Sequence, residues 1–216
     1  MKILPKFFSA LCIVYVIVLL GACTQNKNDN ASVTLKDSLK LPEGNEYATT
    51  DQSPVDISYF PKEFPQNKMS GTLLLQAPVA RVIYSRPHKK GRPIFGIDEK
   101  NLCPYGKPWR LGANESTEIE FFMPVVINGK NVNAGRYVMY CIPHADKWIV
   151  VLNSNIDSWG LQIDPSKDIL QAEVPVQKHI PALEDFTIVF ESAGYGADLI
   201  IAWDEVKVAL PVTFSK

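Results

Sequence analysis

A short part of the chain, from Tyr84 to Glu115, holds most of the side chains that could recognise a charged ligand. The arginines in it stand next to a proline or a tryptophan. A guanidinium is planar and always charged, and it can donate two parallel hydrogen bonds to a carboxylate or a phosphate. Aromatic side chains alternate with these arginines and could form the wall of a cleft. The candidate ligand-binding residues are Arg86, Lys90, Arg92, Trp109, Arg110, Asn114 and Glu115.

In such a site the arginines would hold an anion, Trp109 would form the wall, and Asn114 would bind a polar group of the ligand. The same residues also fit a structural interpretation, in which Arg110 pairs with Glu115 or Asp98. Asn114 would then stabilise a turn through its side-chain hydrogen bonds. Aromatic residues of an all-β domain belong more often to the core, and lysines in turns are usually hydrated. The sequence leaves both interpretations open.

Signatures of several enzyme classes are missing from the sequence, namely the G-x-S-x-G elbow, the H-E-x-x-H helix and the G-x-x-x-x-G-K-[ST] phosphate loop. Glu118 and Glu120 alternate with apolar residues, which favours a solvated sheet face over an acid–base pair. A hydrolase that uses Glu115 or Asp168 as acid or base is nevertheless a third hypothesis, because catalytic residues can converge from distant loops. The histidines lack metal-ligand spacing, so we expect no metal and no cofactor.

The elements that must position these residues are strands. Residues 117–122, 170–176 and 205–214 alternate apolar and polar side chains, which is the pattern of a sheet with one buried face. Residues 135–143 and 147–153 are apolar on both faces, as expected of central strands. Helical periodicity is nearly absent. We therefore predict an all-β fold, an antiparallel β-sandwich or jelly roll of roughly eight or nine strands with little helix.

The N-terminus predicts where the protein is located. Residues 1–22 have the basic start, short apolar core and small residues of a signal peptide. They lead into the sequence LGAC, which resembles a bacterial lipobox, so we expect Cys23 to carry acyl chains such as palmitate. Residues 23–52 are then a lipidated, flexible tether and residues 53–216 a single domain. We expect a protein anchored through this lipid in the cell envelope, at the outer membrane.

Two cysteines remain in the expected domain, Cys103 and Cys141. Export to an oxidising compartment would allow a disulfide, which would stabilise the domain by about 3 to 4 kcal/mol. Two separate buried thiols fit the sequence equally well, because the distance between the two Cα atoms cannot be deduced from it.

Several segments of the expected domain are more specific than generic strands and turns. They are SPVDISYFP (residues 53–61), YSRPHKKGRPIFG (84–96), PYGKPWRLGANEST (104–117) and INGKNVNAGRYVMYCIP (127–143), followed by SWG and KDIL. Together they resemble domain of unknown function 2911, over nearly all of the chain after the tether. The resemblance implies an exported protein, mostly of Bacteroidota and their relatives, with no assigned activity.

Some proteins of that family carry the label asparagine synthetase B, and the residues argue against it here. Such an enzyme uses an N-terminal cysteine with a free amine as nucleophile, whereas Cys23 would be acylated. The nearest match to its pyrophosphate loop, SAGYGAD at residues 192–198, lacks the consecutive glycines and the serine after the aspartate. The chain is also too short for the two domains that this chemistry needs.

The charge of the chain narrows its partners. The 216 residues carry a formal net charge of −1, which favours neither nucleic acid nor a strongly anionic surface as the partner. We therefore expect a membrane-anchored binding module for a small anionic or carbohydrate ligand. A structural or interaction protein that binds another envelope protein, and the hydrolase described above, are the alternatives.

Overall fold

The computed structural model describes residues 51–71 and 77–214. The expected signal peptide, the expected lipidation site Cys23 and nearly all of the expected tether lie outside the described residues. From Asp51 onward the chain forms one compact unit. In the part of the chain that the structure describes, no helix is both long and apolar enough to cross a membrane.

Strands make up most of this unit, and the helical elements of the described residues are short. The strands are β1 (Val55–Phe60), β2 (Ala80–Ser85), β3 (Phe95–Gly96), β4 (Cys103–Pro104), β5 (Thr117–Phe121), β6 (Val125–Ile127), β7 (Lys130–Val132), β8 (Gly135–Pro143), β9 (Lys147–Asn153), β10 (Asp168–Pro175), β11 (Gln177–Ala193) and β12 (Gly196–Phe214). The helical elements are α2 (Phe64–Met69) and a 3-10 turn at Pro165–Lys167. The all-β prediction with little helix is therefore confirmed.

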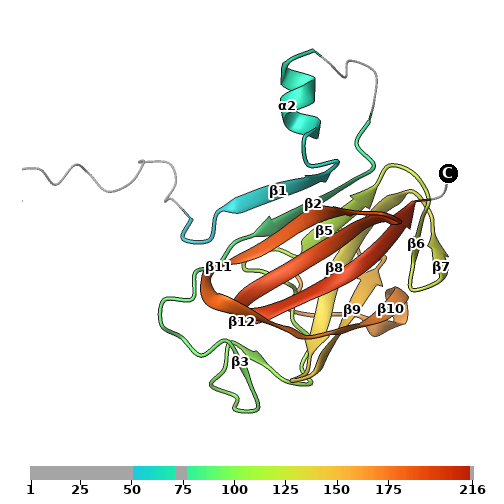
Figure 1. Ribbon diagram of the computed structural model, residues 1–216. Coiled ribbons are helices and arrows are strands. Elements are labelled where there is room, and N and C mark those ends of the chain that lie inside the picture. Colours follow the sequence, from blue (N-terminus) through green and yellow to red (C-terminus); the bar gives the residue numbers. More distant parts are fainter. Residues whose placement is uncertain (1–50, 72–76, 215–216) are drawn as a thin grey trace, which may run out of the picture. The chain divides into compact units, whose positions relative to one another are not determined.

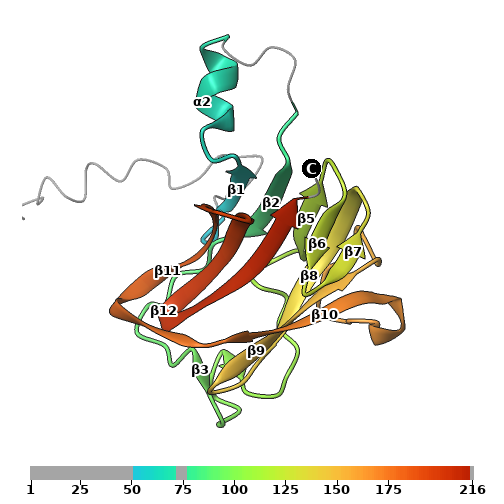
Figure 2. The same ribbon diagram turned by 45° about the vertical axis from the view of Figure 1, so that its right-hand side comes forward.

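The strands form two antiparallel sheets and one short ladder. The larger sheet has six strands in the order β1-β2-β5-β8-β9-β10, and the smaller has four in the order β11-β12-β6-β7. Strands β3 and β4 pair in parallel, outside both sheets. In Figures 1 and 2 the orange and red strands β11 and β12 form one layer, and the green and yellow strands β5 and β8 belong to the other.

The side-chain patterns of the sequence explain this arrangement. In β5, Thr117, Ile119 and Phe121 are buried, whereas Glu118 and Glu120 are half-buried on the other face. Strand β10 alternates in the same way. Strands β8 and β9, with apolar residues on both faces, lie in the interior of the six-stranded sheet. Burial with a period of two thus determines which face of each strand meets the opposite sheet.

Five aromatic rings pack together in the core and against it, and we call them the aromatic cluster. Neighbouring ring centroids in it lie 4.9–6.1 Å apart, in stacked, tilted and edge-to-face geometries. Trp148 and Trp203 are fully buried and come from opposite sheets, so the cluster joins the two layers. Its members are Phe95, Trp109, Trp148, Phe186 and Trp203.

The structure differs from the expectation in its last two strands, which contain 17 and 19 residues. Strand β11 starts directly after β10, so the chain passes from the six-stranded sheet straight into the four-stranded one. The pairing of β11 with β12 shifts register around Leu183. Pro175 is the last residue of β10, close to the end of the alternating segment 170–176 predicted from the sequence, and Pro181 lies within β11. The register shift between Lys178 and Leu183 spans Pro181, so the pairing of β11 with β12 continues past this proline.

Candidate functional site

A pocket of about 510 Å³ brings together three of the predicted ligand-binding residues, Arg92, Trp109 and Arg110. Its wall also contains parts of the chain that are distant in the sequence, including Ser53 and the segment around Leu161. Its volume lies within the usual range for small-molecule sites. The complete lining is Ser53, Pro87, Arg92, Leu102, Pro108, Trp109, Arg110, Gly112, Ala113, Gly160, Leu161 and Ile163.

Trp109 is held in place by backbone and ring contacts. The backbone N–H of Trp109 donates to the Cys141 carbonyl at 2.7 Å, and the backbone carbonyl of Trp109 accepts from the Cys141 N–H at 2.9 Å. These bonds attach the segment before β5 to β8. The indole belongs to the aromatic cluster, and its ring centroid lies 5.8 Å from that of Trp203. The Trp109 side chain is half-buried. Trp109 is therefore both a packing residue and a wall of the pocket.

Arg110 differs from the arginines that the structure pairs with carboxylates. Its Nε is buried and has no hydrogen-bond partner among the described residues. Burial lowers the pKa of its guanidinium below the ordinary value. The predicted pairing of Arg110 with Glu115 or Asp98 is not found in the structure. A desolvated cation that lines a pocket without a carboxylate partner can bind an anion strongly.

Two other buried polar atoms form a different arrangement on the six-stranded sheet. Arg81 Nε and Glu120 Oε2 are both buried, and they lie 2.7 Å apart across β2 and β5. Their hydrogen-bond angle is poor, but their charges neutralise each other. Of the buried side-chain nitrogens in the described residues, the Arg110 Nε is the one that lacks any partner.

The stem of Arg110 is covered by a loop that approaches closely because it contains a glycine. Gly160 has a φ of +79°, and a Cβ added to it would lie 3.0 Å from Arg110 Cβ and 3.1 Å from Arg110 Cδ. The same Cβ would lie 2.6 Å from Ser116 Oγ. The hydroxyls of Ser116 and Ser158 are 3.1 Å apart, which ties this loop to the start of β5. The loop therefore restricts the position of the Arg110 side chain at the pocket.

Arg92 lies in the loop between β2 and β3, and its side chain lines the pocket. Its Nε donates to the Lys89 carbonyl at 3.0 Å, and its Nη2 donates to the carbonyl of His88. The side chain is exposed, and no carboxylate among the described residues pairs with it. Arg92 thus adds a second positive charge to the lining.

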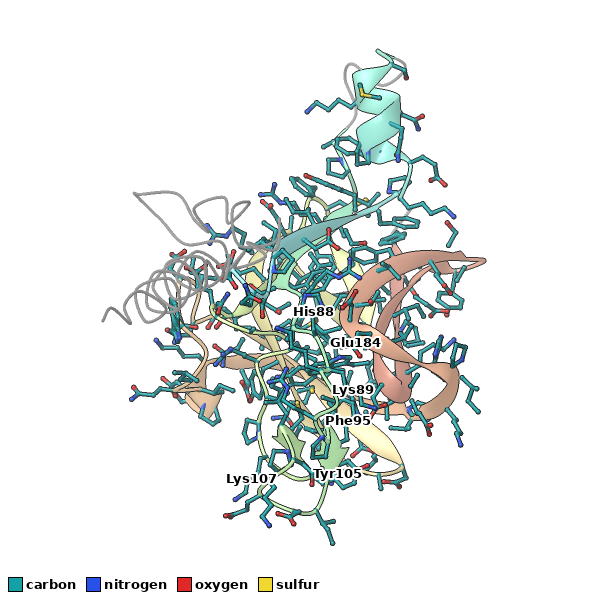
Figure 3. All side chains as sticks on the ribbon, turned by 90° about the vertical axis from the view of Figure 1, so that its left-hand side faces the viewer. His88, Lys89, Phe95, Tyr105, Lys107 and Glu184 are labelled. Carbon is teal, nitrogen blue, oxygen red and sulfur yellow. The ribbon has the colours of Figure 1, made fainter. Side chains whose placement is uncertain are left out.

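The same loop is fastened to the four-stranded sheet by charged contacts. His88 pairs with Asp185, and the Lys89 N–H donates to the Glu184 carbonyl at 2.7 Å. Lys89 Nζ also contacts Asp204, in β12. Figure 3 shows His88, Lys89 and Glu184 side by side where this loop meets the orange strand. These contacts hold the loop that carries Arg92.

Arg86, a predicted ligand residue, has a structural role in the described domain. Its Nη1 lies 3.1 Å from Asp56 Oδ2, its Nε donates to the Phe186 carbonyl at 3.1 Å, and its Nη2 donates to Thr187 Oγ1 at 3.3 Å. Asp56 belongs to the six-stranded sheet and Phe186 to the four-stranded sheet. Arg86 therefore links the two layers, and its donors are occupied by protein groups.

Three further predicted ligand residues also lie outside the pocket lining. Lys90 Nζ approaches Gln52 Oε1 at 3.4 Å. Asn114 has a φ of +58° and donates to Asp51 Oδ2 at 2.5 Å, which connects its turn to a residue that is distant in the sequence. Glu115 is exposed and faces a different hollow.

The carboxylates considered for a hydrolase are not combined in one site. No aspartate or glutamate of the described residues lines the pocket. Asp168 accepts from the Tyr140 hydroxyl at 2.9 Å and from Asn153 Nδ2 at 2.8 Å. Burial, together with the bond to Asp168, raises the pKa of Tyr140 above its ordinary value. Asp168 therefore accepts hydrogen bonds at the start of β10.

The two cysteines of the domain are buried, free thiols. Burial raises the pKa of both thiols well above the ordinary range, and Cys103 further raises the pKa of Cys141. Of the two alternatives left open by the sequence, the structure has the separate thiols. Across the described residues, no group of three or more histidine, cysteine, aspartate or glutamate side chains could hold a metal ion.

Sequence reasoning missed the part of the pocket formed by Gly160, Leu161 and Ile163. Nothing in the residue types of this loop indicates that it folds over Arg110. The tripeptide SWG that precedes Leu161 was among the segments that identified the family, and it could have directed attention to this loop.

The chain belongs to the family described as protein of unknown function, DUF2911, whose profile matches residues 65–212. This match confirms the family inferred from the motifs. Among curated proteins and among solved structures, nothing matches the chain.

Proposed function

We propose that this member of the DUF2911 family is a lipid-anchored binding protein of the cell envelope, whose pocket holds a small anion on Arg110. The observation that carries the proposal is the buried Nε of Arg110, which lacks a partner at the wall of a pocket of about 510 Å³. An unpaired buried polar group costs about 1–3 kcal/mol, and more if it is charged. A carboxylate or phosphate bound to the guanidinium would pair its charge and so offset part of this cost.

The neighbouring residues support an anion over a cation. Arg92 adds positive charge to the same lining, and no acidic side chain of the described residues opposes it there. The half-buried Trp109 ring offers a flat apolar wall beside the charges. Together they form a pocket in which an anionic group is paired and the rest of the ligand is shielded from water.

Titration of the purified full chain with inorganic phosphate and with acetate tests the anion site, with calorimetry as the measurement. Arg110→Gln removes the charge and should abolish binding, and Arg110→Lys keeps the charge without the fork and should weaken binding about tenfold. Lys130→Gln is the matched control, because Lys130 is an exposed cation on β7 that does not line the pocket. Wild-type affinity in Arg110→Gln, or an equal loss in Lys130→Gln, would contradict the proposal.

Anchoring is supported by the sequence LGAC and the signal-peptide features before it. Mass spectrometry of the N-terminal peptide tests it, and we expect Cys23 as the first residue, with a diacylglycerol on its sulfur. Treatment of cells with globomycin should make the uncleaved precursor accumulate. An unmodified mature N-terminus at any other residue would refute the anchor and would leave the anion site untouched.

A further inference from the structure

The pocket is larger than an inorganic ion requires. A volume of about 510 Å³ lies within the range of sites that enclose small organic molecules. Apart from the two arginines and Ser53, its lining consists of apolar side chains, prolines and glycines. Charge is therefore concentrated in the arginines, and most of the remaining wall cannot form hydrogen bonds through its side chains.

Two leucines of the lining are exposed although they are apolar. Leu161 is 70% exposed and Leu102 is 42% exposed, and both belong to the pocket wall. Single exposed leucines are common on protein surfaces, but these two share a concave site with the half-buried Trp109. An apolar group bound between them would remove that surface from water.

The lining also disfavours several classes of ligand. An amino acid would place an ammonium group where no aspartate or glutamate of the described residues lines the wall. A free sugar would bring many hydroxyl groups to a wall whose neutral polar side-chain groups are the Ser53 hydroxyl and the Trp109 indole N–H. Polar groups buried without partners cost binding energy, so both classes would leave hydrogen bonds unmade.

We infer that the ligand is a small, soluble organic anion that carries one carboxylate or phosphate and an apolar body. Its anionic group binds Arg110 and Arg92, and its apolar body lies against Trp109, Leu102 and Leu161. This inference rests on the proposed function, because it assigns a ligand class to the same pocket. Of the anionic and carbohydrate ligands expected from the sequence, it selects an anion and adds an apolar body.

Two pairs of probes test the apolar body, at constant ionic strength and on the purified full chain. Phenyl phosphate is compared with inorganic phosphate, and benzoate with acetate, by calorimetry. We expect the aromatic member of each pair to bind at least about tenfold more tightly, since burial of a ring adds more than the free energy of one decade in affinity. Equal affinities within both pairs would overturn this inference and leave the anion site standing. Absence of binding by all four probes would overturn the proposed function itself.

Variants separate the two parts of the site. Leu161→Ser should reduce the advantage of phenyl phosphate by about threefold or more and leave inorganic phosphate unaffected. Ile169→Ser is the matched control, because Ile169 is half-exposed on β10 and does not line the pocket. An equal loss in the two variants would refute the assignment of the apolar wall. Phosphatidylglycerol vesicles should not displace phenyl phosphate, and displacement by them would point to a membrane lipid in place of a soluble anion.

Discussion

The position of Gly160 makes a sharp prediction about stability and binding together. In Gly160→Ala the residue would keep a φ of +79°, which costs an L-residue about 1–2 kcal/mol. Its new methyl group would also lie 2.6 Å from Ser116 Oγ and 3.0 Å from Arg110 Cβ. The serine can rotate away, with the loss of its contact to Ser158. Arg110 Cβ is fixed to the backbone, so the loop or the arginine must shift.

A contact with backbone-anchored atoms is an overpacking effect, which costs about 1–3 kcal/mol in addition to the strained φ. Gly129→Ala is the matched control, because Gly129 has a φ of +72° and nothing lies within 4 Å of its added Cβ. The difference between the two variants therefore isolates the packing against Arg110 and Ser116. For a domain of this size, it corresponds to about 2–12 °C in Tm.

Thermal unfolding followed by circular dichroism gives the two Tm values, and the phosphate titration gives the two affinities. We expect Gly160→Ala to unfold at a lower temperature than Gly129→Ala and to bind phosphate more weakly, because the guanidinium is displaced. Gly129→Ala should bind as the wild type does. Equal Tm values together with wild-type affinity in Gly160→Ala would show that this loop does not position Arg110, and the reasoning would be refuted.

Three further measurements follow from the contacts and pKa shifts. Arg110→Met should leave Tm unchanged or raise it, because an unpaired buried donor is removed. Arg86→Met should lower stability by about 1.5–3 kcal/mol, because charged hydrogen bonds are lost. A larger loss of stability in Arg110→Met than in Arg86→Met would contradict this. Burial raises the pKa of Tyr84 from 10.0 to about 12, so the stability it contributes is complete below pH 10 and is lost as the pH rises towards 12. Urea unfolding at several alkaline pH values should therefore show a shallower decline in Tyr84→Phe, and an identical decline would argue against this origin. Because both thiols are buried, iodoacetamide should alkylate Cys103 and Cys141 slowly in the native protein and rapidly after unfolding. Peptide mass spectrometry measures the alkylation. Absence of alkylation after unfolding would reveal a disulfide.

Strand patterns were predictable because burial alternates along a strand with a fixed period. The side chains of β5 and β10 lie where that period places them. The passage of β10 into β11 with a single residue between them was not predictable, since the register shifts in β11 depend on its partner strand. The residue types of a segment do not determine how it pairs with a strand that is distant in the sequence.

The arginines illustrate the same limit at the site. Arg86 stands beside a proline and Arg110 beside a tryptophan, and both were candidates for the same reason, yet only Arg86 has its Nε paired with a protein group. The difference arises from the pairing of β1 with β2, which places Asp56 opposite Tyr84 and near Arg86. The connection between these strands is long, so the sequence contains no hairpin signal that would fix this register. Residue type identified the candidates, and tertiary contacts distinguish them.

The aromatic cluster has an optical consequence. Of the four tryptophans of the chain, Trp109 is in ring contact with both Trp148 and Trp203, and it also lines the pocket. Excitation energy absorbed by the two buried indoles can pass to Trp109, whose emission responds to the water and charge beside it. The protein's intrinsic fluorescence should therefore be dominated by the indole that a ligand would cover. Emission spectra can thus detect pocket occupancy in the unlabelled protein, and Trp159→Phe would remove the background of the exposed fourth indole.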